Sequence, residues 1–165
     1  MEEKLLEAFN KQINLEFSSA YLYFAMSTYF CEIMMDGFAE LMRKKAKEKL
    51  TCAQKIYDYL ILRDEKLSFS RIEEPSNDWI NVSDIFSTSL SHEEFILTNI
   101  KELYKTARDV DDIAAMEFIS SILDKQIKIT GYFRKLVFRV KNANLVSSNV
   151  EFINYECLKD EVSVV

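Results

Sequence analysis

Apolar residues recur at alternating steps of three and four positions over four long stretches of the chain. This spacing is typical of helices that bury one face against neighbouring helices. The stretches cover about residues 3–32, 38–63, 83–108 and 113–141. Only short breaks, near Gly37 and at Asp109 to Asp112, separate the first from the second and the third from the fourth. The pattern therefore predicts two hairpins of antiparallel helices.

A long segment without helical period joins the two hairpins. It covers residues 64–81 and contains the only proline, Pro75. After a polar break at Ser147 to Asn149, a short amphipathic stretch at about residues 149–158 predicts a fifth helix. We therefore expect an all-α fold, a four-helix bundle (about 3–141) with one long crossover and a short fifth C-terminal helix. All of it would form one domain, residues 1–165.

Composition supports long helices and narrows the class of protein. Two glycines and one proline in 165 residues are too few for the many turns of a β protein. No apolar run is long enough to span a membrane and the N-terminus is no targeting peptide, so we expect a cytoplasmic protein without a membrane partner. The three cysteines lack paired spacing, which predicts reduced thiols. A net charge of −6 argues against a nucleic-acid partner.

The row of apolar residues along each of the four stretches, which we call its seam, is interrupted by a polar residue. The four are Glu16, Lys49, Glu93 and Gln126, each near the middle of its stretch. Antiparallel packing would bring them to one level in the bundle core, where an unpartnered charge costs several kcal/mol, on the order of 5. They must either satisfy one another as a hydrogen-bonded layer or bind a metal, and the spacing alone favours neither reading.

Diiron carboxylate bundles offer a comparison for this layer. They place a lone Glu on each of two helices and a Glu-x-x-His pair on each of the others, because iron prefers carboxylate and imidazole ligands. Glu16 and Glu93 match the lone glutamates, but the second stretch has Lys49 and Cys52 where the pair should stand. The only histidine, His92, is expected to point away from the core, since it adjoins Glu93 on the helix.

Several segments together resemble the bacterial-type non-haem ferritins over nearly the whole chain. They are LLEAFNKQINLEFSSAYLY at residues 5–23, AQKIYDYL at 53–60, IEEP at 72–75 with Trp79, HEEF at 92–95, and the tail around 150–158. The resemblance implies a ferritin-like bundle that assembles into a hollow cage of 24 subunits and stores ferric mineral. It also implies a ferroxidase centre in each subunit that oxidises ferrous iron with oxygen or peroxide.

The resemblance also implies roles for individual residues. Glu16, Glu93 and Gln126 match ligand or near-ligand positions for iron, and Glu48 matches one acid of an adjacent third iron site. Tyr23 matches a neighbouring tyrosine.

The departures from the family gather around this same site. The family has glutamate at position 49, histidine at 52 and acids at 125 and 128, whereas this chain has Lys49, Cys52, Lys125 and Lys128. Position 129, usually acidic, is isoleucine, and position 121, commonly tryptophan, is Ser121. We hypothesise that the Lys49 ammonium stands in the place of an iron ion and bridges Glu16 and Glu93.

The sequence thus predicts a subunit for intracellular iron storage and homeostasis with a degenerate ferroxidase centre and weak or absent intrinsic ferroxidase activity. It would form a homo-oligomer, or a hetero-oligomer with an active ferritin that supplies the oxidation. Three alternatives stay open. The chain could be a catalytically dead scaffold or partner subunit, a cage that stores no iron, or an oxidase with a rearranged site that uses Cys52.

Overall fold

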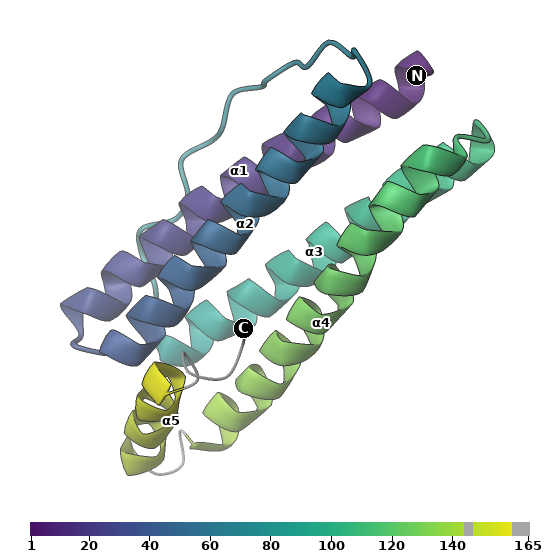
Figure 1. Cartoon of the computed structure of the whole chain (residues 1–165). Helices are drawn as coiled ribbons and strands as arrows, with labels where there is room; N and C mark the ends of the chain where they lie inside the picture. Colours follow the sequence, from purple (N-terminus) through teal and green to yellow (C-terminus); the bar gives the residue numbers. More distant parts are fainter. Residues whose placement is uncertain (144–146, 160–165) are drawn as a thin grey trace.

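Five helices make up the regular structure of the part of the chain that the structure describes, residues 1–143 and 147–159 of a computed structural model. They are α1 (Glu3–Glu32), α2 (Asp36–Leu62), α3 (Val82–Asp109), α4 (Ile113–Ala143) and α5 (Ser147–Lys159). Figure 1 shows α1 beside α2 and α3 beside α4 as two long hairpins, with the short α5 across one end. The predicted all-α bundle with one long crossover and a fifth helix is confirmed. None of these helices is long and apolar enough to cross a membrane.

The first turn between helices differs from the sequence prediction. The break lies at residues 33–35, and Gly37 already belongs to the first turn of α2. The left-handed residue of this turn is Met34, with φ of 57°. Gly37 is needed for a different reason, because a Cβ atom there would lie 1.8 Å from the backbone oxygen of Asn154 in α5.

Side-chain caps mark the N-terminal starts of α3 and α4. Asn81 accepts a hydrogen bond from the backbone N–H of Asp84 at 3.0 Å and so caps α3. Asp112 accepts from the N–H of Ala115 at 3.0 Å at the start of α4, as the predicted break at Asp109 to Asp112 requires. Such caps satisfy N–H groups that the first helical turn leaves without partners.

Two apolar clusters fill the bundle, one on each side of its polar middle. One gathers Phe30, Phe38, Phe86 and Phe133 near α5, and the other gathers residues such as Leu5, Phe9 and Ile100 at the far end. In α3 the period of apolar residues indicated Leu97 and Tyr104 as core residues, but these are only half-buried. Their neighbours Ile96 and Leu103, one position earlier, are the buried ones.

The crossover runs along α1 and is attached to it by two asparagines. Asn10 Oδ1 accepts a hydrogen bond from the backbone N–H of Ser68 at 3.0 Å. One turn later, Asn14 Oδ1 accepts from the N–H of Ser70 at 2.9 Å, and its Nδ2 donates to the carbonyl of Ser68 at 3.3 Å. This extended segment is therefore positioned by α1 through its own backbone.

Helix α5 is fastened to the start of α2. Asn154 Oδ1 accepts a hydrogen bond from the backbone N–H of Phe38 at 2.9 Å, one of the donors that the first turn of α2 cannot satisfy internally. Val150 and Ile153 bury their side chains in the apolar cluster below. The hydrogen bond and the close approach at Gly37 together define how α5 docks on the bundle.

Candidate functional site

The four polar residues that interrupt the seams meet at the middle of the bundle, each from a different helix. Glu16 is 1% exposed, Lys49 2%, Glu93 0% and Gln126 3%, so all four side chains are withdrawn from water. They lie between the two apolar clusters. A polar atom at this depth needs a hydrogen-bond partner, because leaving it unpaired in the interior costs free energy.

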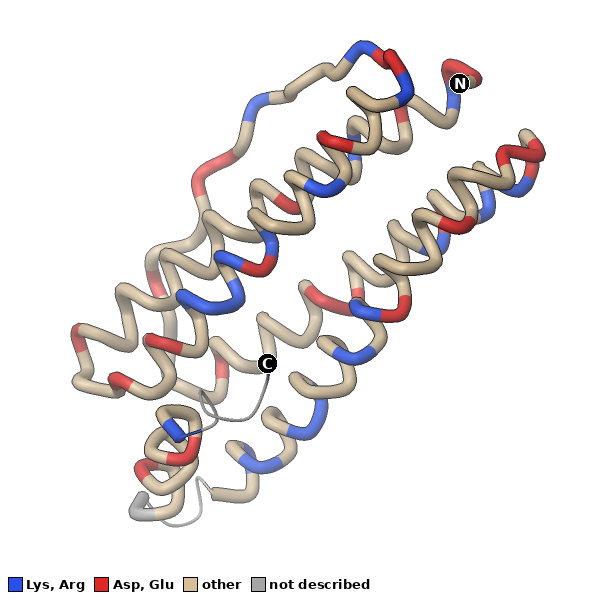
Figure 2. Tube along the Cα trace, viewed as in Figure 1, with Lys and Arg blue, Asp and Glu red and all other residues tan. Residues whose placement is uncertain are grey.

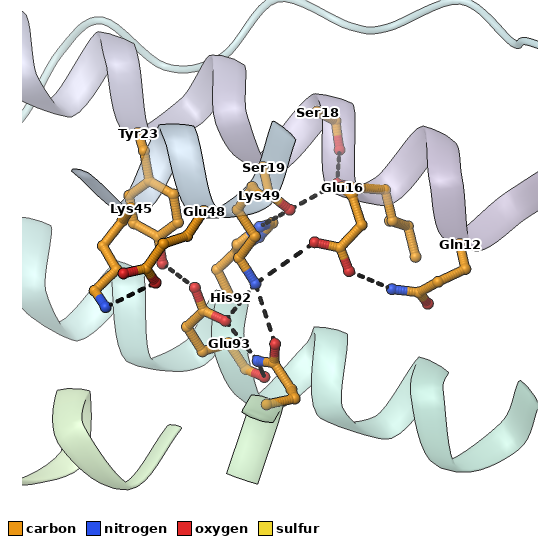
Figure 3. A network of polar contacts seen from close by, with 12 residues as sticks. Gln12, Glu16, Ser18, Ser19, Tyr23, Lys45, Glu48, Lys49, His92 and Glu93 are labelled. Atoms are coloured by element: carbon orange, nitrogen blue, oxygen red, sulfur yellow. Dashed lines mark hydrogen bonds and ion pairs between the residues drawn. The ribbon is translucent and has the colours of Figure 1, made fainter. Parts of the chain in front are cut away.

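Glu93 is the best-satisfied member of the layer. Lys49 Nζ donates to Glu93 Oε2 at 2.7 Å, and Gln126 Nε2 donates to the same oxygen at 2.5 Å. The hydroxyl of Tyr23 donates to the other oxygen, Oε1. Figure 3 shows the contacts from Lys49 and Tyr23 converging on the Glu93 carboxylate. Three donors compensate for the desolvation of one buried carboxylate.

Glu16 is held less completely. Gln12, one turn earlier on α1, donates from Nε2 to Glu16 Oε1 at 2.7 Å. Glu16 Oε2 lies 3.8 Å from Lys49 Nζ, which is an ion pair but too long for a hydrogen bond. No described residue donates a hydrogen bond to this oxygen, although the weakly donating Cys52 thiol lies beside the carboxylate.

The two carboxylates consequently have opposite pKa shifts. Burial raises the pKa of Glu16, and the Lys49 charge and the Gln12 hydrogen bond do not fully offset it. Burial also acts on Glu93, but the Lys49 charge and the hydrogen bonds from Lys49, Tyr23 and Gln126 outweigh it and lower the pKa. The pKa of Lys49 itself is raised, because the attraction of both carboxylates exceeds the effect of burial. Lys49 is therefore an ammonium at neutral pH.

A family comparison fits this four-helix arrangement. The ferritin-like domain matches residues 6–142 of the chain. The chain belongs to the ferritin family. Bacterial non-heme ferritins are similar to it in sequence: that of Staphylococcus aureus is 32% identical over 81% of this chain and 80% of its own length. That of Staphylococcus epidermidis is 33% identical with the same coverage.

Solved ferritin structures share the fold in detail. The open pore ferritin of the archaeon Archaeoglobus fulgidus superimposes with a TM-score of 0.93 at 29% sequence identity, covering 95% of this chain and 97% of that one. A humanized archaeal ferritin gives a TM-score of 0.93 over 95% of each chain. The similarity thus extends over the whole bundle and α5.

The central layer of this ferritin is a poor fit for bound iron. Iron takes carboxylate and imidazole ligands, whereas a protonated amine has no lone pair to offer. Lys49 Nζ stands between the Glu16 and Glu93 carboxylates (Figure 3), at the position that a bridging cation would take. Residues 1–143 and 147–159 contain no group of three or more His, Cys, Asp or Glu side chains arranged to hold a metal ion.

Cys52 is poorly suited to replace the missing imidazole. Burial and the neighbouring Glu16 charge raise the pKa of its thiol to about 12. The thiolate is the form that binds metals and reacts, so at neutral pH Cys52 is a thiol. A protonated thiol at this position does not favour an oxidase built on Cys52.

The remaining family positions lie at the edge of the layer. Glu48 is half-buried and accepts a hydrogen bond from Lys45 at 3.0 Å, so its charge is already paired within α2. Lys125 and Lys128 are exposed on α4. A small cavity of about 40 Å³ between α2 and α4 is lined by Glu48 and Lys125 but not by Lys128.

The structure also corrects the expectation for His92. Its Nε2 lies 2.8 Å from Ser19 Oγ, and its ring packs edge-on against Tyr23 with centroids 6.3 Å apart. Burial lowers the pKa of His92 to about 4, so the imidazole is neutral. It is a half-buried packing residue behind the layer, because α1 lies close to α3 on this side of the bundle.

Two further members of the layer escaped the sequence analysis. Gln12 supports Glu16, and the hydroxyl of Thr130 donates to the carbonyl of Gln126 at 2.9 Å within α4. Both are buried polar residues one helical turn from a predicted member. Each lies four residues from Glu16 or Gln126, and side chains at that spacing share a helix face, so the sequence could have indicated that they join the layer.

Proposed function

We propose that this ferritin is a subunit of a cytoplasmic iron-storage cage whose own ferroxidase activity is weak or absent. Membership of the family supports iron storage, and the 24-subunit cage follows from the resemblance to bacterial-type ferritins. Iron is here the substrate and cargo. The family positions for iron that this chain retains are Glu16, Glu48, Glu93 and Gln126, and the Lys49 ammonium lies among them.

The observation that carries the proposal is the hydrogen bond of 2.7 Å between the Lys49 ammonium and Glu93. A ferrous ion that entered the layer would have to displace this buried ammonium or lie beside it. Like charges at such a distance repel strongly where water is excluded, because the effective dielectric constant is low. Lys125 lines the cavity beside the layer and adds a second positive charge that would repel a ferrous ion entering through this cavity.

The test is addition of ferrous iron to the purified, assembled protein without oxygen, followed by air. Ferric absorbance and oxygen uptake are recorded against a blank without protein. Oxidation at the rate of the blank is the expected result. Fast oxidation that saturates at a fixed number of irons per subunit would contradict the proposal.

A restored variant makes the same assay sharper. Lys49→Glu combined with Cys52→His would supply a carboxylate and an imidazole on one face of α2, and we expect it to regain part of the oxidation. Lys47→Glu is the matched control, because it makes the same charge change at an exposed position of α2. If both variants stay at the blank rate, the defect extends beyond the two replaced positions.

Storage is tested separately from oxidation. Assembled particles are exposed to iron oxidised by an added active ferritin, either mixed with it or co-assembled, and retained ferric iron is measured after size separation. Retention is expected. Particles that assemble but retain no more iron than a protein of similar size and charge would favour the scaffold alternative.

A further inference from the structure

The cavity between α2 and α4 opens beside the central layer and is large enough for a small ligand. Its volume is about 40 Å³. A single water needs only about 10–15 Å³ by the same kind of measure, so the cavity has room for more than one water or for a small ion. Its polar lining includes Glu16, Lys49, Cys52, Lys55, Lys125 and Gln126.

Two hydrogen-bonding groups of the layer are left to be satisfied from this cavity. An ammonium has three donors, and Lys49 uses one on Glu93 and one on Gln126 at 3.2 Å. Glu16 Oε2 is buried and has no described hydrogen-bond donor other than the weakly donating Cys52 thiol beside the carboxylate, and it stands 3.8 Å from that ammonium. A ligand that meets both groups must accept a hydrogen bond from Lys49 and donate one to Glu16.

The charge around the cavity favours an anion. Lys55 and Lys125 contribute exposed ammonium groups to its lining, whereas the buried ammonium of Lys49 is already paired with Glu93. Of the acids in the lining, Glu48 is neutralised by Lys45 at 3.0 Å. Figure 2 shows that basic residues also recur along α4, although the whole chain is acidic. The surroundings are thus locally basic around one unsatisfied carboxylate oxygen.

We propose that this cavity binds hydrogen phosphate. The ion combines oxygens that accept from the lysines with one hydroxyl that donates to Glu16 Oε2, which matches the two unsatisfied groups. Sulfate has the same shape and charge but no proton at neutral pH, so it would face the Glu16 carboxylate without a donor. A site built to bond a hydroxyl discriminates strongly against an analogue that lacks it.

The first experiment is calorimetric titration of iron-free protein at about pH 8, so that phosphate trapped by ferric mineral is not measured. Inorganic phosphate should bind at about one ion per chain. Sulfate, and a phosphate monoester that carries no proton at this pH, should bind at least about tenfold more weakly, the effect of one lost hydrogen bond to a charged group. Sulfate or monoester binding as tight as phosphate, or stoichiometry far below one, would overturn the proposal.

Variants separate a defined site from general attraction to lysines. Lys125→Gln should weaken phosphate binding about tenfold, while Lys128→Gln, an exposed lysine of α4 outside the cavity lining, should leave it within about twofold. Equal losses in the two variants would mean non-specific attraction and would refute the site.

Two more variants test the cavity and the carboxylate without touching a lysine. Ser121→Trp, at an exposed residue of the lining, should fill the space and abolish binding. Glu16→Gln offers an amide that can donate or accept, so phosphate should still bind and its advantage over sulfate should shrink. Unchanged phosphate binding in Ser121→Trp would place the ion elsewhere.

Discussion

Replacing Lys49 by methionine tests whether its ammonium is what neutralises the core. Lys49→Met keeps an unbranched side chain, shorter only by the charged terminal atom, but leaves the fully buried Glu93 without its cation. Breaking a buried ion pair from one side costs about 3–5 kcal/mol. Glu93 retains its hydrogen bonds from Tyr23 and Gln126, so we expect the lower end, about 3 kcal/mol.

Chemical unfolding at a fixed subunit concentration measures this loss, since oligomer assembly makes stability depend on concentration. Lys47→Met is the control on the exposed side of α2 and should stay within about 0.5 kcal/mol of the parent protein. Adding Glu93→Gln to Lys49→Met removes the stranded charge and should recover part of the loss, because directly bonded residues do not behave additively. The reasoning is refuted if Lys49→Met costs no more than Lys47→Met, or if the double variant loses the sum of the two single losses.

Three further predictions concern pH and the glycines. Folding lowers the pKa of Glu93, so its contribution to stability is present above the ordinary carboxyl pKa and is lost as pH falls through the folded pKa. Folding raises the pKa of Glu16, so its contribution to stability is present in acid and is lost as pH rises through the folded pKa. In urea unfolding at about pH 7, Glu93→Gln should therefore cost more than Glu16→Gln, and the difference should narrow below about pH 4. The NMR titration of His92 should give a pKa of about 4, and its stabilisation should be lost as pH falls from 6.5 towards that value. Gly37→Ala should release α5, seen as faster hydrogen exchange in residues 147–159, whereas Gly131→Ala, with open space around its Cβ, should stabilise α4 by about 1 kcal/mol.

The helices could be predicted because each carries its own signal. The period of apolar residues located all four bundle helices, and Asn81 and Asp112 lie at the predicted starts of α3 and α4 as caps. The polar layer could be predicted for the same reason: a charge at a core position must find a partner, and antiparallel helices bring their middles to one level. These features can be predicted because they depend only on residues within one helix, or on the fact that antiparallel helices meet at their middles.

Features that depend on contacts between distant segments were missed or wrongly explained. Gly37 was interpreted as a helix break, yet it is required by the backbone of Asn154, more than 100 residues later. His92 was expected to point away from the core, but its ring reaches Ser19 of α1. Neither partner can be found from local sequence, because both contacts are set by how whole helices lie against one another.

The unequal contacts of Lys49 with the two glutamates also could not be predicted from the sequence. The hypothesis had the Lys49 ammonium bridge two glutamates through hydrogen bonds, whereas it bonds Glu93 directly and lies 3.8 Å from Glu16. Which carboxylate is nearer depends on side-chain rotamers and on the helpers Gln12 and Tyr23. A difference of about 1 Å in such contacts decides the direction of a pKa shift, and residue identity alone does not encode it.

The way the crossover is held has a consequence for which sequences it can tolerate. Asn10 and Asn14 hydrogen-bond the crossover through the backbone of Ser68 and Ser70, so these bonds do not depend on which side chains stand at the two exposed positions. The exception is proline, which has no N–H to donate. These two positions therefore tolerate almost any other residue, because the hydrogen bonds made there are specified by the two asparagines of α1.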